Sequence, residues 1–323
     1  MLAARAAELG EGLSLCRGEG ALVLHCPASG VGNTLPPVAV QFTILASGSS
    51  GNCAYLETPG TRLLIDAGLS ARQIRQRLLT LGKAPEGLHG ILITHEHSDH
   101  VQGLAVLAGK LRIPVYCNRL TREAILADLS GEVPFQVFTT GSTFEVGEVV
   151  VENFSIPHDA QDPVGFLLRT PSGNIGFLTD LGHATRLVVE RVRPSQILVL
   201  EANHDHQLLQ DDLKRPWSVK QRIASRHGHL ANEDAAEVAV QVASPQLKHL
   251  FLGHLSRDCN RPELAQRIVQ GRLQQAGIHH VSLSVASPDV PGPTVTLGGA
   301  VSVAQPASAS ASAPAPAPAS TSA

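Results

Sequence analysis

The segment THEHSDH, residues 94–100, constrains this chain more than any other feature. It places four side chains that can bind a metal ion within six residues, directly after an apolar stretch that predicts a strand over 90–93. A loop at the end of a strand can turn such side chains toward one point, whereas a helix would spread them around its axis. The mixture of imidazole and carboxylate donors suits zinc, manganese or iron, and its density suits two ions. The alternative is a polar loop with solvated histidines, which would repel one another when protonated.

Composition limits the class of protein. The chain has 323 residues, 43% of them apolar, which is enough for one large domain or two small ones. A formal net charge of −3 means that any binding of nucleic acid must depend on a local basic patch. The five cysteines form no CxxC pair and their number is odd, as expected for reduced thiols in a cytoplasmic protein. No apolar run reaches about 18 residues and no signal peptide is evident, so we expect no membrane segment.

The two ends of the chain differ from its middle. Residues 1–38 lack sustained periodicity and predict a poorly ordered extension, with one possible short helix over 2–9 or a mis-assigned start codon. Residues 301–323 are almost entirely Ala, Ser and Pro and predict a disordered tail, because they cannot bury enough apolar surface to offset the entropy of ordering. The folded domain is therefore expected over 39–300.

Within that domain, strand-like and helix-like segments alternate, which predicts an α/β fold. The order gives two β-rich halves, each with helices, and two sheets packed face to face with helices outside would bury both sheets. The expected strands are 40–46, 53–57, 62–65, 90–93, 115–117, a piece near 144, 149–155, 165–169, 175–178, 197–200, 249–252, 281–285 and 294–297. The expected helices are 71–81, 101–108, 218–225, 232–242 and 262–275.

The THEHSDH segment resembles the HxHxDH signature of the metallo-β-lactamase fold superfamily. Four further motifs of this chain match that family's pattern in order, each after a short apolar strand: LLIDAG, SIPHDA, FLTDLG and LGHLS. They supply Asp66, His158, Asp180 and His254. The resemblance implies a four-layer αββα sandwich.

The resemblance also implies a centre of two divalent ions, zinc or manganese. One ion would be held by His95, His97 and His158, the other by Asp99, His100 and His254, with Asp180 bridging them and Asp66 supporting the site without binding metal. Two ions about 4 Å apart can share a water and present hydroxide near neutral pH. Asp99 would also orient the attacking water, which implies a hydrolase.

A narrower resemblance covers residues 42–297. The segments FTILASGSSGN, LLIDAGLSARQI, ITHEHSDHVQG, SIPHDAQDPVGF, VLEANHD, PWSVKQRI, GHLANEDAA and LGHLSRDCN are similar to those of the YycJ/WalJ-like group. That resemblance implies a nuclease, with exonuclease activity on DNA. It also implies that His229, in GHLANEDAA, donates a proton to the leaving oxygen; the alternative is a residue at the start of a helix that its neighbours cap.

Substrate-binding residues are expected around the metal ligands. Asn203 and His204 follow a predicted strand and can line the cleft, and the run 214–229 has five cationic residues and no acidic one, among them Lys220 and Arg222. The chain's only tryptophan, Trp217, can stack on a base or lie in the core, and we expect the core.

Two departures from related nucleases narrow the prediction. Too few residues separate Asp180 from His254 to hold the large inserted lid of the β-CASP nucleases, and the long Gly/Pro-rich arm of tRNA-processing ribonuclease Z is missing. We therefore do not predict tRNA maturation. The alternatives are a hydrolase of small esters or thioesters resembling glyoxalase II, which has the same ligands, and a non-enzymatic metal-stabilised protein, against which the full ligand set argues.

Overall fold

A computed structural model describes residues 39–298. The extension expected over 1–38, with its possible helix over 2–9, and the tail expected over 301–323 lie outside the described residues. The domain boundaries at 39 and 300 accordingly stay predictions. Within residues 39–298, no helix is both long enough and apolar enough to cross a membrane.

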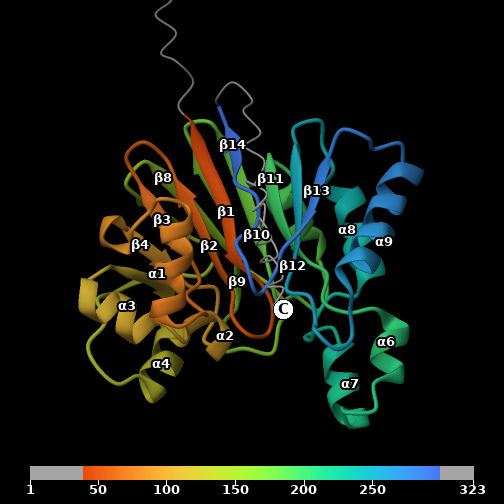
Figure 1. The fold of residues 1–323 in the computed structure, drawn as a ribbon, viewed down its shortest axis with the longest axis horizontal. Helices are drawn as coiled ribbons and strands as arrows, with labels where there is room; N and C mark the ends of the chain where they lie inside the picture. The colour runs from red at the N-terminus through yellow and green to blue at the C-terminus, as the bar shows by residue number, and fades with distance from the viewer. Residues whose placement is uncertain (1–38, 299–323) are drawn as a thin grey trace, which may run out of the picture. The chain divides into compact units, whose positions relative to one another are not determined.

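The first sheet has an antiparallel half and a parallel half (Figure 1). In spatial order it contains β14 (Val295–Leu297), β1 (Val40–Ala46), β2 (Cys53–Glu57), β3 (Arg62–Ile65), β4 (Gly90–Leu92), β5 (Val115–Asn118) and β6 (Phe135–Phe138). Pairing is antiparallel from β14 to β3 and parallel from β3 to β6. The carboxyl ends of β3, β4 and β5 therefore meet at one edge of the sheet.

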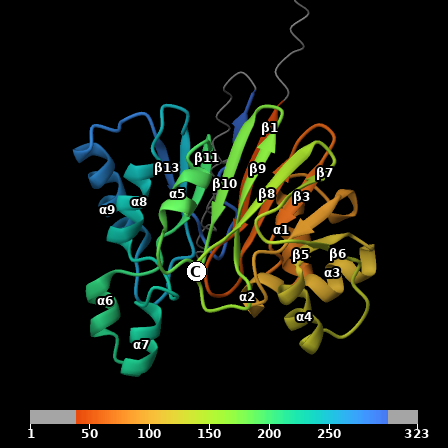
Figure 2. The same cartoon turned by 180° about the vertical axis from the view of Figure 1, so that it is seen from behind.

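The second sheet repeats this division (Figure 2). Its spatial order is β13 (Ser282–Val285), β12 (His249–Gly253), β11 (Ile197–Glu201), β10 (Gly173–Leu178), β9 (Val164–Thr170), β8 (Val149–Ser155) and β7 (Thr143–Val146). Strands β10 to β13 are parallel, and β7 to β10 are antiparallel. The carboxyl ends of β10, β11 and β12 also share one edge.

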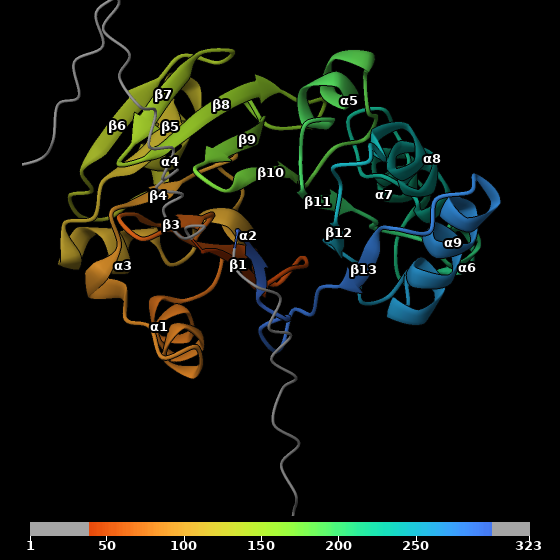
Figure 3. The ribbon, with the colours of Figure 1, turned by 90° about the horizontal axis from the view of Figure 1, so that it is seen from above.

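Helices cover the outer face of each sheet, as seen from above in Figure 3. Beside the first sheet lie α1 (Ala71–Thr80), α3 (Leu104–Leu111) and α4 (Arg119–Asp128), and beside the second lie α5 (Arg186–Val192), α8 (Asn232–Val242) and α9 (Pro262–Gln275). Three short helices lie in loops at one edge of the sheets: α2 (Ser98–Val101), α6 (His206–Asp211) and α7 (Trp217–Ile223). A single 3-10 turn, η1 (Pro85–Gly87), precedes β4.

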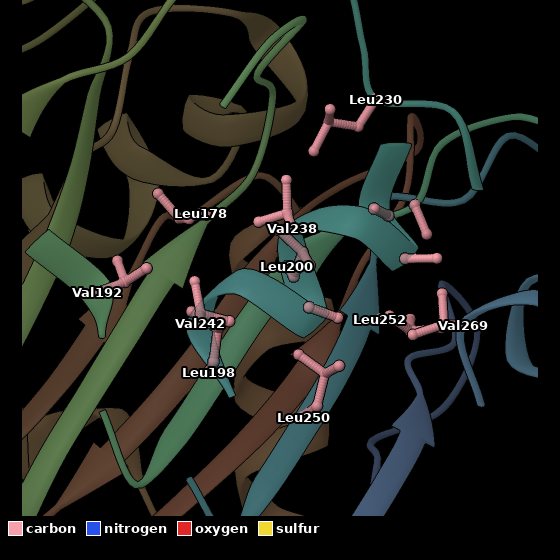
Figure 4. Close-up of a cluster of buried hydrophobic side chains, with 14 of the residues drawn as sticks. Leu178, Val192, Leu198, Leu200, Leu230, Val238, Val242, Leu250, Leu252 and Val269 are labelled. Atoms are coloured by element: carbon pink, nitrogen blue, oxygen red, sulfur yellow. The ribbon is translucent and has the colours of Figure 1, made fainter. Parts of the chain in front are cut away.

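Three buried clusters make the four layers. One contains apolar side chains from both sheets, which shows that the sheets pack face to face. A second joins the first sheet to α1, α3 and α4. The third joins β10, β11 and β12 to α5, α8 and α9, where Leu198, Leu200, Leu250 and Leu252 meet Val242 (Figure 4). The predicted αββα sandwich is confirmed.

Most predicted elements are present within one or two residues, and the exceptions have local causes. The helix expected over 101–108 is two helices, α2 and α3, interrupted at Gly103, where a Cβ atom would lie 2.2 Å from the Leu69 carbonyl oxygen. Helices α4, α5 and α6 were not predicted, although Asn118, Thr185 and Asp205 cap their N-termini with side-chain hydrogen bonds. Helices α5 and α6, with 7 and 6 residues, are too short to show a clear helical periodicity, whereas α4, with 10 residues, is as long as the predicted α1 and was simply missed.

The inter-sheet core supplies a stability test. Phe42 on β1 and Phe251 on β12 are fully buried with ring centroids 6.0 Å apart, so they join the two sheets directly. Phe251→Ala should lower the free energy of unfolding by about 3–5 kcal/mol, from lost burial and the remaining cavity. Urea unfolding in EDTA measures this without a contribution from metal binding. Leu187→Ala, at a side chain 56% exposed on α5, is the matched control and should change stability by less than about 0.5 kcal/mol. Equal losses in the two variants would contradict this core.

Candidate metal centre

The predicted site residues follow the ends of strands and meet at one edge of the two sheets. Asp66 follows β3, the THEHSDH segment follows β4, His158 lies three residues after β8, Asp180 follows β10, and His254 follows β12. Helix α2, which carries part of THEHSDH, lies at the same edge as α6 and α7 (Figures 1 and 2). Parallel strands that end at a common edge explain why residues so far apart in sequence come together.

Three of these residues have a left-handed backbone. Asp66, Asp180 and His254 have φ values of 60°, 56° and 55°, and Arg112 is the one other non-glycine residue with positive φ in the described part of the chain. Such conformations are unfavourable for L-residues and persist only where surrounding contacts hold them. Each of the three ends or follows a strand of the parallel part of a sheet. The strain is therefore concentrated where the chain turns a polar side chain into the site.

The THEHSDH segment is only partly a loop. His95 and His97 lie in the loop after β4, but Asp99 and His100 lie in α2, so the expectation that all four sit in a loop is wrong. The amide of His100 donates to the carbonyl of His97, which starts the helical turn there. Gly68 packs against this turn so closely that a Cβ atom on it would lie 1.6 Å from the Asp99 carbonyl oxygen.

His95, His97 and His158 form the first group of facing donors. Nδ1 of His97 lies 3.1 Å from Nε2 of His95 and 3.4 Å from Nε2 of His158. Burial lowers the pKa of His158, and it lowers that of His95 well below its ordinary value, with a further contribution from His100. These two imidazoles are therefore neutral, which is the form that binds metal. Nδ1 of His158 donates to the carbonyl of Gly228, which leaves Nε2 for the centre.

Asp99, His100 and His254 form the second group, and Asp180 faces both groups. Oδ2 of Asp99 lies 3.4 Å from Nε2 of His254 and 3.7 Å from Nε2 of His100. The Asp180 carboxylate lies 3.1 Å from Nε2 of His100, 3.4 Å from Nε2 of His254 and 3.9 Å from Nε2 of His158. Each of the two groups, and also Asp180 with His95 and His100, offers ligand atoms within 4.8 Å of one another.

Asp180 itself tests whether a cation fits. Its side chain is 2% exposed, and Oδ2 accepts no hydrogen bond from the described residues, although His100 is near. Burial would raise the pKa of this carboxyl, but His254 and His100 hold it well below its ordinary value, so it is ionised. A buried carboxylate oxygen without a hydrogen-bond donor is costly, and a cation between the two groups satisfies it. The donor set fits zinc or manganese.

Asp66 lies behind the facing donors. It is fully buried and accepts hydrogen bonds from the amide and hydroxyl of Thr94 and from Nδ1 of His100, the last at 2.8 Å. The bond to His100 fixes the tautomer and points Nε2 at Asp180. Asp66 lies outside the groups of facing donors, and its role in supporting the site stays a prediction.

Glu201 is a site residue that the sequence analysis missed. It ends β11 fully buried, and its Oε1 lies 2.9 Å from Nδ1 of His254 and 2.8 Å from Nδ1 of His229. Its Oε2 accepts from the amides of Leu181 and Leu230. His254 and His229 help to hold the pKa of Glu201 at about 2 although burial would raise it. A lone glutamate at the end of the apolar strand ILVLE was the available signal.

His229 faces the cluster from the side of α8. Burial would lower its pKa, but the Glu201 carboxylate raises it above the ordinary value. Nδ1 lies 3.7 Å from Asp180, and 22% of the side chain is exposed. His229 is thus a half-buried imidazole beside the cluster, and it precedes α8 rather than capping it.

A cleft of about 160 Å³ opens onto this cluster. Asn203, His204 and Arg222, predicted to bind substrate, line it, but Lys220 does not, because its ammonium donates to the Gln210 carbonyl and joins α7 to α6. The prediction that Trp217 lies in the core is wrong: it is 65% exposed, since α7 buries none of its side chains.

The basic run 214–229 is less positive than its sequence indicates. Lys214 pairs with Asp258, Arg215 with Asp212 and Asp258, and Arg222 with Asp159. The acidic partners come from other segments of the chain, or lie just before the run. The field at this surface is therefore largely balanced.

Comparison with known proteins agrees with this geometry. A family model described as a beta-lactamase superfamily domain matches residues 61–254. The chain is 37% identical over 243 residues to the exodeoxyribonuclease YycJ of Bacillus anthracis, covering 74% of this chain and 91% of that protein. It is 38% identical over 245 residues to the exodeoxyribonuclease WalJ of Streptococcus pneumoniae, covering 75% and 91%.

A solved structure shows the same fold at lower identity. The metallo-beta-lactamase fold protein YhfI from Bacillus subtilis superposes with a TM-score of 0.62 at 14% identity, over 80% of this chain and 99% of that one. The matched length, the sequence identity and the fold lead to one assignment. The chain is a metal-dependent hydrolase that belongs to the beta-lactamase superfamily and, within it, to the family of YycJ and WalJ.

Proposed function

We propose that the protein is a phosphodiesterase that removes nucleotides from the ends of nucleic acid, and that its main substrate is DNA. The observation that carries this proposal is the placement of His229, hydrogen-bonded to the Glu201 carboxylate, in the same cleft as the metal-binding groups. Hydrolysis of a phosphodiester needs both a metal centre and a proton donor, because a nucleophile must attack phosphorus and an alkoxide must leave. The names of the two exodeoxyribonuclease relatives support DNA as substrate.

The proposed ligand set follows from the facing atoms. His95, His97 and His158 would hold one ion, while Asp99, His100 and His254 would hold the other. Asp180 would serve both, since its Oδ2 lies 3.1 Å from Nε2 of His100 and its Oδ1 lies 3.9 Å from Nε2 of His158. Bound zinc or manganese would make water more acidic and offset charge on the substrate's oxygens.

The chain's own groups then have separate tasks. Asp99, whose side chain is 21% exposed toward the cleft, accepts a hydrogen bond from the attacking water and so orients it. His229 donates its proton to the leaving oxygen, and Glu201 holds the imidazole in place for this transfer. Arg222, at the rim, can exchange its contact with Asp159 for a phosphate oxygen.

A thioester hydrolase resembling glyoxalase II would use the same ligands, so the metal centre does not distinguish the two. A thiolate leaves without being protonated, however, whereas an alkoxide does not. His229 therefore favours the phosphodiesterase.

Asp180→Asn tests the metal centre. The amide keeps the shape but removes the bridging charge, so bound metal measured by atomic absorption should fall by about one ion per chain, and hydrolysis by at least about 10²-fold. Asp128→Asn, at the exposed end of α4, is the matched control and should keep the metal content and the activity of the wild type. Unchanged metal content in Asp180→Asn would refute the bridging assignment.

His229→Ala tests the proton donor. Cleavage of DNA should fall by about 10²–10⁴-fold, because its leaving alkoxide needs a proton. Cleavage of bis-p-nitrophenyl phosphate should fall far less, since nitrophenolate leaves unaided. His227→Ala, two residues away and exposed, should match the wild type. Equal losses on both substrates would show that His229 has another role.

A substrate panel tests the proposed function as a whole. Purified protein with Mn²⁺ or Zn²⁺ is incubated with end-labelled DNA, end-labelled RNA and S-lactoylglutathione, each with and without EDTA. We expect EDTA-sensitive release of nucleotides from DNA ends. Hydrolysis of the thioester alone would refute the nuclease.

A further inference from the structure

His204 is a buried side chain without a hydrogen-bond partner that lies at the cleft. It is 1% exposed, and neither Nδ1 nor Nε2 makes a hydrogen bond with the described residues. Buried polar groups almost always have partners, and one without them costs stability. Because His204 also lines the cleft beside the metal-binding groups, a bound ligand can supply the missing partners.

The position of His204 is fixed from three directions. Its carbonyl accepts from the amide of Asn232, and the preceding amide of Asn203 donates to the carbonyl of Leu230. On the other side, the amide of Asp205 donates to the carbonyl of Cys259. His204 also forms an isolated parallel bridge with Ala231. A backbone held this way fixes the position of His204 at the cleft before a ligand binds.

The surroundings of His204 select an uncharged ligand. Burial lowers the pKa of its imidazole to about 4, so the ring is neutral at neutral pH, with one donor and one acceptor. Arg215, which also lines the cleft, is paired with Asp212 and Asp258. The neutral ring of His204 itself offers no charge to a phosphate.

The walls and the size of the cleft fit a single ring system. Leu209 and Ile223, from α6 and α7, supply apolar lining. An engineered cavity of about 150 Å³ holds benzene, and this cleft, at about 160 Å³, is of similar size. The metal-binding groups line the same cleft, so a base would occupy the part beside His204, Leu209 and Ile223. A base edge offers the donor and acceptor that the His204 ring lacks, and apolar walls are the usual surface against which an extruded base stacks.

We propose that His204 recognises the base of the terminal nucleotide, with Leu209 and Ile223 as the apolar walls of a nucleobase subsite. This inference rests on the proposed nuclease function. The subsite sets a preference for an unpaired end that still has its base, rather than the rate of the chemical step.

The test compares terminal nucleotides with and without a base. Two pairs of single-stranded oligonucleotides are used. In the first pair, one member has a normal and the other an abasic nucleotide at the 5′ end. The second pair differs in the same way at the 3′ end. For the end that is attacked, the wild type should have a KM roughly tenfold lower for the base-bearing substrate, the scale of one or two hydrogen bonds. His204→Ala should abolish that preference, so that its KM values for the base-bearing and the abasic substrate become equal.

Two further variants make the result specific. His204→Gln keeps a donor and an acceptor and should restore part of the preference, which also guards against an alanine variant that fails to fold. His206 is a neighbour of His204, with ring centroids 5.7 Å apart. The variant His206→Ala is therefore the matched control and should behave as the wild type.

Three outcomes would overturn the inference. In the first, wild type cleaves both oligonucleotides with equal KM. In the second, His204→Ala or His204→Gln lowers kcat on every substrate alike, as a purely structural role would. In the third, no oligonucleotide is cleaved while the thioester is, which removes the nuclease function itself; the first two leave that function standing.

Discussion

The Asp180 carboxylate is the group on which the site depends. It is buried and ionised, and its neighbours His100, His158 and His254 come from three different segments. A buried charge is tolerated only when opposite charges or cations compensate it. His100 comes from the first sheet and the other residues from the second, so the compensation requires both sheets in place. The site is therefore a consequence of the sandwich and also one of the contacts that join its halves.

Two buried carboxylates arrange the residues around Asp180. Asp66 directs His100, and Glu201 directs His254 and His229 together. Such outer contacts set the tautomer and angle of each imidazole before any ligand arrives. Because one glutamate holds both the proposed metal ligand His254 and the proposed proton donor His229, a change at Glu201 should affect both proposed functions. The left-handed turns at Asp66, Asp180 and His254 show how much the fold strains the backbone to achieve this geometry.

Substrate selection follows from local shape rather than from overall charge. The net charge is −3, and the basic run meets acidic partners at Asp159, Asp212 and Asp258. Exposed ion pairs of this kind contribute little to stability and can be exchanged for contacts with phosphate. In the subsite that we propose, the neutral imidazole of His204 and two apolar side chains would favour a single-stranded end over a duplex.

The sequence by itself determined the fold class, the family and the residues that meet at the centre. These are carried by local patterns: short apolar strands and a polar residue directly after each, as at His95 or Asp180. The ligand roles and the substrate residues stay predictions that this geometry supports. Only the tertiary structure decided that Glu201 joins His229 to His254, that Lys220 turns away from the cleft and that Trp217 is exposed. It also decided that His204 is buried with no hydrogen-bond partner for its ring within residues 39–298. The reason is physical: periodicity reports which way a side chain points from its own element, whereas burial, pairing and charge balance depend on segments far away in the chain.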